Sequence, residues 1–261
     1  MLGLPDVEKF LRLILRTSLS KKIRELRIID PRIFKRLPPG FFPAAVKGRS
    51  FISGERHGEF IFCGLDDGAF VAFYFGLHSG IGFSGLRDRP RDTRAAFIFN
   101  RRECLYYVGR KPLFGSIRLI GSIRDFISSK FLGPDALKVD FQRFREVFKS
   151  VSGKIKPVLM DQMNLAGING SYADEVLFRS GTNPAEKVEF LSEGRLKEIY
   201  GAMKDVFEEA IELETLPKER FLIPNRVKGG GCPRCGDRLT VTRMAGQDAF
   251  FCRSCQPVSS Y

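Results

Sequence analysis

The sequence CPRCGDRLTVTRMAGQDAFFCRSCQ, residues 232–256, contains two close pairs of cysteines, and this spacing decides how the end of the chain folds. Each pair can place two thiolates on one metal ion at tetrahedral geometry, with a β-hairpin between the pairs. The hairpin strands are predicted at residues 239–242 and 249–251, with a turn at residues 245–248. Four thiolates fill the coordination shell, so we predict one structural Zn²⁺ without a catalytic role. The predicted ligands are Cys232, Cys235, Cys252 and Cys255.

The other two cysteines, Cys63 and Cys104, lie in apolar, strand-like surroundings and are predicted to be buried thiols. Disulfides are the alternative for the paired cysteines, but their spacing favours metal binding and therefore a reducing, cytoplasmic location. The apolar stretch 10–15 is interrupted by Arg12 and lacks a cleavage pattern, so it is a poor signal peptide. No run of about 18 apolar residues occurs, so we expect no membrane partner.

The composition fits a folded protein that binds a polyanion. The chain has 261 residues, of which 43% are hydrophobic, which is enough for one large domain or two modest ones. Its 43 Lys and Arg outnumber its 30 Asp and Glu, which gives a formal charge of +13. This excess favours nucleic acid or an anionic membrane surface as partner, and the charge alone does not choose between them.

The hydrophobic pattern changes along the chain from strand-like to helical, which predicts an α+β fold. A short amphipathic helix is expected at about residues 6–16. Strand-like runs follow and predict a β-sandwich or barrel; they are residues 59–64, 69–75, 95–100 and 104–108. Helical patterns come next, at residues 141–149, 157–166, 171–179 and 192–214. Between the two regions, LGPDAL (residues 132–137) carries the turn signals of a hinge or linker.

Four segments together resemble the formamidopyrimidine-DNA glycosylase and endonuclease VIII family. They are LPDVE at 4–8, LGPDAL at 132–137, IKPVLMDQMNLAGINGSYADEVLF at 155–178 and FFCRSCQ at 250–256. The resemblance implies an N-terminal β-sandwich domain at residues 1–131, a helix–two-turn–helix domain at residues 132–227 and a zinc finger at residues 228–261. It also implies binding of duplex DNA between the two larger domains and flipping of a damaged base out of the stack.

The resemblance fails at the positions that carry the family's chemistry. Family members attack the sugar with the amine of an N-terminal proline, next to a glutamate that acts as acid and base. Here the matching residues are Leu2 and Gly3. Leucine disfavours removal of the initiator methionine, so the amine should belong to Met1, about 3.8 Å from the family's position. We therefore assign no catalytic residue, and keep Met1 as an alternative nucleophile.

Several positions that bind phosphate in the family also differ. The family's Arg-Arg-Gly-Lys turn reads Arg56-His57-Gly58-Glu59 here, which replaces a cation by an anion. In the turn before the helix at 171–179, Asn169 and Gly170 stand in exchanged order, and Gln247 replaces an arginine of the zinc hairpin.

The other positions that match DNA contacts are partly retained. Leu77 and Phe114 match loops that fill the gap left by a flipped base, although core packing is an equally plain interpretation of both. The predicted DNA-contacting residues are Arg56, Leu77, Arg110, Phe114, Lys156, Asn169, Gly170, Tyr172 and Gln247.

Other polar features receive structural interpretations. The two histidines are expected to serve as surface or hydrogen-bonding groups. Asp161 and Gln162 are expected to hold a helix end. The basic cluster of Lys21, Lys22, Arg24 and Arg27 is interpreted as a solvated face at the end of a helix.

Two hypotheses follow for the function. The first is a monomeric DNA-binding protein on the glycosylase scaffold that recognises damaged, abasic or distorted DNA and has lost or altered the usual chemistry. The second is an active glycosylase or abasic-site lyase that uses another amine, either Met1 or a lysine such as Lys156. Binding of RNA or the ribosome is a weaker third possibility, because zinc modules of this spacing also occur there. Whether the protein is an enzyme is left undecided by the sequence.

Overall fold

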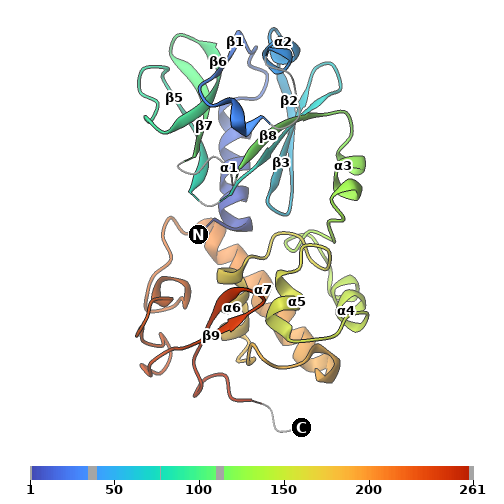
Figure 1. The fold of residues 1–261 in the computed structure, drawn as a ribbon, viewed down its shortest axis with the longest axis vertical. Coiled ribbons are helices and arrows are strands. Elements are labelled where there is room, and N and C mark those ends of the chain that lie inside the picture. Colours follow the sequence, from blue (N-terminus) through green and yellow to red (C-terminus); the bar gives the residue numbers. More distant parts are fainter. Residues whose placement is uncertain (1, 35–39, 77, 110–114, 259–261) are drawn as a thin grey trace. The chain divides into compact units, whose positions relative to one another are not determined.

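The computed structural model describes residues 2–34, 40–76, 78–109 and 115–258 (Figure 1). By their internal contacts these residues form two compact units. The first comprises Leu2 and residues 6–130, and the second comprises Gly3–Pro5 and residues 131–258. The second unit therefore includes three residues from the start of the chain.

The first unit contains two four-stranded antiparallel sheets (Figure 1). One has the strand order β1-β6-β7-β5 and the other has the order β2-β3-β4-β8. The strands are β1 Glu25–Ile28, β2 Phe51–His57, β3 Phe60–Leu65, β4 Phe70–Tyr74, β5 Ser79–Ser84, β6 Thr93–Asn100, β7 Glu103–Gly109 and β8 Ser116–Ile120. Two packed sheets are the architecture of a β-sandwich, so this part of the predicted fold is confirmed.

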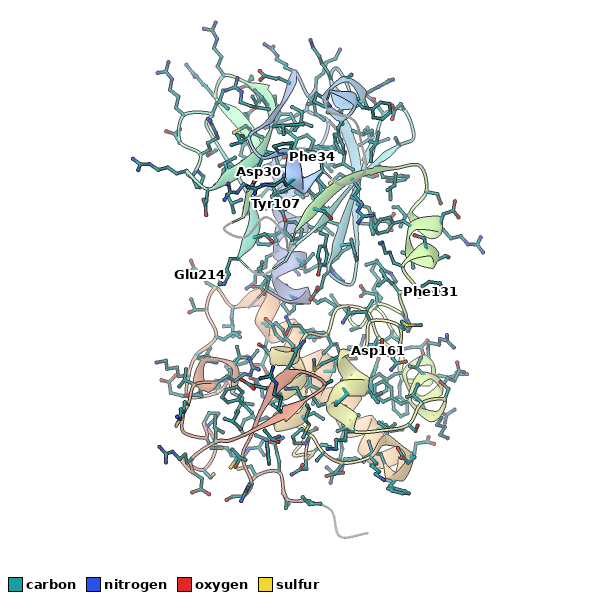
Figure 2. All side chains as sticks on the ribbon, viewed as in Figure 1. Asp30, Phe34, Tyr107, Phe131, Asp161 and Glu214 are labelled. Carbon is teal, nitrogen blue, oxygen red and sulfur yellow. The ribbon has the colours of Figure 1, made fainter. Side chains whose placement is uncertain are left out.

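The core of the first unit lies between the sheets and beneath helix α1 (Leu4–Thr17). Val7, Leu11 and Ile14 recur at intervals of three and four residues, so they share the helix face that is buried in this core. Tyr107, labelled in Figure 2, is 1% exposed, and its hydroxyl donates to the carbonyl oxygen of Tyr74 at 2.9 Å. Its polar end is therefore satisfied within the core.

Two short helices complete the first unit. Helix α2 (Phe41–Val46) contributes Phe42 to the same core. Helix α3 (Ile123–Ser129) places Phe126 against Phe60 and Phe62 of the second sheet, at ring-centroid distances of 5.2 and 5.6 Å. The buried thiols predicted for Cys63 and Cys104 are confirmed, since both residues have no exposed surface.

The second unit is built from helices and a two-stranded sheet. The helices are α4 Phe141–Lys149, α5 Ile155–Met160, α6 Gly170–Arg179 and α7 Glu193–Glu212. Short 3₁₀ turns are formed by Val188–Phe190 and Ile223–Asn225, and by Pro31–Ile33 in the first unit. Asp140 and Ser192 cap α4 and α7 by accepting hydrogen bonds from backbone N–H groups of the first turn. The core between these helices also includes Leu4.

Helices α5 and α6 are joined by two successive turns, which is the predicted helix–two-turn–helix arrangement. The predicted helix 157–166 is too long, because α5 ends at Met160. Asp161, labelled in Figure 2, is extended (ψ 112°), and its carboxylate accepts from the N–H of Met163. The side-chain amide of Gln162 donates to the carbonyl oxygens of Met160 and Ile168. The local hydrogen bonds of Asp161 and Gln162 thus compete with the helix and end it.

The segment 132–137 is anchored rather than loosely linked. Asp135 is buried, and its carboxylate accepts from the N–H groups of Leu137 and Lys138. A Cβ at Gly133 would lie 2.7 Å from the backbone carbonyl of Asn164. The predicted turns are present, but the segment is part of the second unit and is held within it by these contacts.

Strands β9 (Thr240–Met244) and β10 (Gln247–Phe251) form the hairpin between the cysteine pairs. The strands run closer to the tip than predicted, because Met244 pairs with Gln247 and leaves a two-residue turn. Ala245 and Gly246 both have positive φ (46° and 75°), which is typical of a type I′ turn. Gln247 therefore lies in a strand and not in the turn.

Among the helices of the described residues, none is both long and apolar enough to traverse a lipid bilayer.

Candidate functional site

The second unit brings together three segments that the sequence analysis singled out. They are Gly3, the turn before α6, and the start of β10. A Cβ placed on Gly3 would lie 2.5 Å from the ring of Tyr172 and 2.8 Å from the side-chain nitrogen of Asn169. A Cβ placed on Gly170 would collide with the side-chain oxygen of Gln247. Five predicted site residues thus form one cluster.

Asn169 occupies the N-cap position of α6. Its backbone is extended (φ −98°, ψ 174°), and its side-chain oxygen accepts from the N–H groups of Ser171 and Tyr172 at 3.0 and 3.1 Å. Asparagine is among the best N-cap residues, so the order Asn169-Gly170 suits the start of this helix. The cap uses the side-chain oxygen, while the N-terminus of the helix keeps its positive end of the dipole.

The packing around Gly3 leaves no room for a side chain. Tyr172 is 4% exposed, and its ring packs against Phe207 of α7 with a centroid distance of 5.6 Å. Real Cβ atoms do not approach other heavy atoms to 2.5 Å, so any larger residue at position 3 would displace this ring or the chain itself. The space next to the N-terminal segment is therefore filled by Tyr172 and Asn169.

Lys156 has no exposed surface and lies in a network of buried charges. Its Nζ is 2.6 Å from the carboxylate of Asp174 and donates to the carbonyl oxygen of Asp248 at 2.7 Å. Asp174 also accepts from the guanidinium of Arg226 at 2.9 Å and from the N–H of Phe250 at 3.1 Å. Burial lowers the pKa of Lys156, and the neighbouring Asp174 carboxylate opposes this shift.

This network joins α5, α6 and the zinc hairpin through one carboxylate. Such placement favours a structural role for Lys156 over the predicted contact with DNA. Arg226 adds a second tie, because its guanidinium also donates to the hydroxyl of Ser171 and stacks over the ring of Phe250. Sequence reasoning missed Arg226, since nothing within its own segment signals a partner 52 residues earlier in the chain.

Arg56 is also engaged in the interior, within the first unit. It is 2% exposed; its Nε donates to the carboxylate of Glu8 at 2.7 Å, and its Nη1 donates to the carbonyl oxygen of Gly58 at 3.1 Å. Because it is buried and paired with Glu8, this guanidinium offers almost no surface to a phosphate. Next to it, at the turn between β2 and β3, burial raises the pKa of Glu59 to about 7.

Four predicted positions, Met1, Leu77, Arg110 and Phe114, lie outside the described residues. Their proposed roles as nucleophile, wedges or phosphate contact remain predictions.

The four paired cysteines converge as the sequence analysis predicts. Their sulfur atoms all lie within 4.8 Å of one another, with Sγ–Sγ distances of 3.8 Å for Cys232 and Cys255 and 3.5 Å for Cys235 and Cys252. Four sulfurs at about 2.3 Å from one zinc ion would be separated by about 3.8 Å, whereas a disulfide requires about 2.05 Å. The geometry is therefore consistent with a structural zinc site.

Glu175 gives the second unit an expected dependence on pH. It has no exposed surface, its carboxylate accepts from the N–H of Ile223 at 2.9 Å, and burial raises its pKa from 4.5 to about 7. A raised pKa means that the folded state favours the neutral acid. The contribution of neutral Glu175 to the stability of the folded state is therefore complete below pH 4.5 and is lost as the pH rises towards 7.

We expect the wild-type unit to lose about 2 to 3 kcal/mol more stability between pH 5 and 7.5 than Glu175→Gln, which has no proton to lose. Urea unfolding at the two pH values, monitored by hydrogen exchange of the amides in α6, measures this difference. Glu208→Gln on the exposed side of α7 is the control and should keep the wild-type profile. Equal pH profiles for Glu175→Gln and wild type would contradict the assignment.

Comparison with family models gives two matches. The formamidopyrimidine-DNA glycosylase N-terminal domain matches residues 1–115, and the formamidopyrimidine-DNA glycosylase H2TH domain matches residues 132–219. Among curated proteins, the chain is 29% identical to a formamidopyrimidine-DNA glycosylase of Thermus thermophilus over 97% of both chains. It is 25% identical to that of Pelotomaculum thermopropionicum, over 98% of this chain and 99% of the relative.

Solved structures agree in fold. The chain resembles Lactococcus lactis Fpg in its complex with DNA that contains an abasic site, with a TM-score of 0.85 and 23% identity over 98% of this chain and 99% of that one. A complex of the same protein with DNA that contains Fapy-dG gives a TM-score of 0.85 and 23% identity, over 97% and 99%. These likenesses confirm the predicted architecture of sandwich, helix–two-turn–helix and cysteine module.

Proposed function

Because the chain belongs to the formamidopyrimidine-DNA glycosylase family, we propose that it binds damaged, abasic or distorted DNA and that the family's usual chemistry is lost or altered in it. The partner fits the formal charge of +13. We further infer that the cysteine cluster holds one structural Zn²⁺, which fixes the hairpin next to the turn that begins α6.

The packing around Gly3 carries this proposal. In the family a glutamate follows the nucleophilic proline, and its match here is Gly3. Tyr172 and Asn169 occupy the volume that a side chain at this position would need. An acid at position 3 is therefore absent from the sequence and has no room in the fold. Without a positioned acid and base, departure of a damaged base loses a contribution of about 10²- to 10⁴-fold in rate.

An active lyase that uses another amine is the alternative. Lys156 is a poor nucleophile for it, because its amine is buried and paired with Asp174. The alternative therefore rests on the amine of Met1. A free amine next to an abasic sugar can form an iminium and cleave the strand slowly, so this activity needs fewer groups than base excision.

Trapping with borohydride on abasic-site DNA distinguishes the two. We expect the wild-type protein to bind the abasic duplex more tightly than the undamaged duplex and to form no more adduct than a sample with a blocked N-terminus. A strong adduct that disappears on blocking would establish the lyase. Equal affinity for both duplexes would overturn the proposed recognition of damage.

Two variants test the role of the N-terminal positions. In Leu2→Pro, removal of the initiator methionine exposes a secondary amine, and we expect adduct formation to rise at least tenfold. The double variant Leu2→Pro/Gly3→Glu should show no further gain and should be less stable by about 1 to 3 kcal/mol, because its new side chain meets Tyr172. Efficient base excision by the double variant, with unchanged stability, would refute the argument from packing.

A further inference from the structure

The excess positive charge of the chain belongs almost entirely to the first unit. Residues 6–130 contain 24 Lys and Arg against 12 Asp and Glu, whereas residues 131–261 contain 19 against 18. Within the first unit, the arrangement of the strands gathers many of these cations at one end of the β1-β6-β7-β5 sheet.

Strand pairing defines this end. Ser84, the last residue of β5, pairs with Cys104 near the start of β7, and Asn100, the last residue of β6, pairs with Glu103. Glu25, the first residue of β1, pairs with Ile98 of β6. The loop that follows β5, the turn between β6 and β7, and the segment that leads into β1 therefore all leave the sheet at the same end.

Side-chain contacts hold these three segments together. Lys21 forms a 2.6 Å ion pair with Glu103 and lies over the ring of Phe83 at 4.8 Å. A Cβ at Gly85 would lie 3.7 Å from the carbonyl oxygen of Arg102, so the loop after β5 touches the β6–β7 turn. The cations carried by the three segments thus share one surface, and Figure 2 shows nitrogen-tipped side chains that project from this region.

We call the cations of this surface the basic end. Six of the seven are arginines, and none has a carboxylate at ion-pair distance in the part of the chain that the structure describes. Asp88 and Asp92 are the acids of the same loop, so the balance stays strongly positive. The basic end consists of Lys22, Arg24, Arg87, Arg89, Arg91, Arg101 and Arg102.

The chemistry of the basic end favours nucleic-acid phosphates over a membrane. A guanidinium presents a planar fork of donors that matches phosphate oxygens, which lysine does not. Insertion into a lipid interface needs exposed large apolar side chains. In these segments Ile23 is fully buried and Leu86 packs over Ala96, Ile98 and Cys104 on the outer face of the sheet.

The basic end lies at the opposite end of the sheet from Ser79, where β5 begins, and Gly109, where β7 ends. The segments that the resemblance associates with a flipped base, residues 76–78 and 110–115, adjoin these two residues in the sequence. Six or seven extended residues span about 20 Å. We propose that the basic end binds the phosphate backbone of a second nucleic-acid segment, without regard to sequence or damage. This second segment would be bound at the same time as the damaged DNA of the proposed function.

Uptake of a second duplex by the full protein tests this proposal. The protein is saturated with an unlabelled, short abasic-site duplex, and a fluorescent undamaged duplex is added at several KCl concentrations. We expect wild type to take up the second duplex. Arg87→Gln/Arg91→Gln/Arg101→Gln/Arg102→Gln should bind it at least tenfold more weakly, and its slope of log affinity against log salt should be smaller by about 3 to 4. Its affinity for the first duplex should change less than twofold.

The matched control removes four charges elsewhere, as Arg124→Gln/Lys187→Gln/Lys197→Gln/Lys218→Gln, and should keep wild-type uptake within twofold. An equal loss in the control, or no second duplex on wild type, would overturn the proposal. Binding to phosphatidylserine vesicles without uptake of duplex would also overturn it. If the protein does not prefer the abasic duplex, only the proposed recognition of damage fails. The proposal for the basic end is still tested, because the affinities of the two quadruple variants for the undamaged duplex can be compared.

Discussion

Replacing Cys252 by serine is expected to abolish the binding of one zinc ion per chain and to unfold the hairpin of β9 and β10. Structural zinc contributes about 10 to 16 kcal/mol of apparent binding free energy in small zinc-finger peptides, and that energy is folding energy. Without zinc the hairpin would depend on the contacts of Asp248 and Phe250 with Lys156, Asp174 and Arg226, and on a buried cluster that is small. That cluster consists of Phe178, Leu222, Cys232, Leu239 and Cys252. Zinc released to a chromogenic chelator and proteolysis within residues 228–256 measure the two effects.

Cys104→Ala is the control for this experiment, since Cys104 is a buried thiol of the first unit that lies outside the cluster. It should keep one zinc ion per chain and a protease-resistant hairpin. The loss in Cys252→Ser should extend to DNA binding, because Gln247 of β10 packs on Gly170 in the turn before α6. A Cys252→Ser protein that retains zinc and resists proteolysis would contradict the assigned site.

Replacing Lys156 by methionine is expected to destabilise the second unit by about 3 to 5 kcal/mol. Methionine fills most of the volume of the lysine stem, but it leaves the Asp174 carboxylate with one cation fewer in the interior. Hydrogen exchange in α6 and in β10 should report the loss in both elements, because both share this carboxylate. Lys197→Met on the exposed surface of α7 should stay within about 0.5 kcal/mol of wild type.

The same variant separates the two roles considered for Lys156. If Lys156 contacted a phosphate, its replacement would lower DNA affinity and the salt dependence of binding while leaving the stability of the protein unchanged. The buried network predicts the reverse. The double variant Lys156→Met/Asp174→Leu should recover part of the loss, because it removes both charges together. Absence of recovery would show that Asp174 does not depend on Lys156.

The sequence predicts what depends on local patterns and misses what depends on distant partners. The spacing of the four cysteines predicts that they converge on one metal ion, and the helical periodicity of the apolar residues predicts the helix Phe141–Lys149. Both features could therefore be identified from the sequence. Helix α5 was overextended because the apolar pattern continues past Met160, while the side chains of Asp161 and Gln162 end the helix through local hydrogen bonds.

The candidate site shows the same division. From the sequence, the cation at position 156 is predicted to contact phosphate. The structure instead places the Asp174 carboxylate and the carbonyl oxygen of Asp248 around its amine. The basic end is the opposite case, because Arg24 was read as part of a solvated helix end and in fact leads into β1. Only the pairing of β1, β6 and β7 brings it beside the arginines of the loop that follows β5 and of the β6–β7 turn.

The packing of Tyr172 against Gly3 has an evolutionary consequence. If the acid at position 3 was lost in the ancestry of this chain, single substitutions cannot simply retrace that loss, because any side chain restored there meets an occupied volume. The ring at position 172 or the main chain at residue 3 would have to move first, and the ring is held by its contact with Phe207. A substitution that frees space at Tyr172 would therefore have to precede any substitution that restores a side chain at position 3.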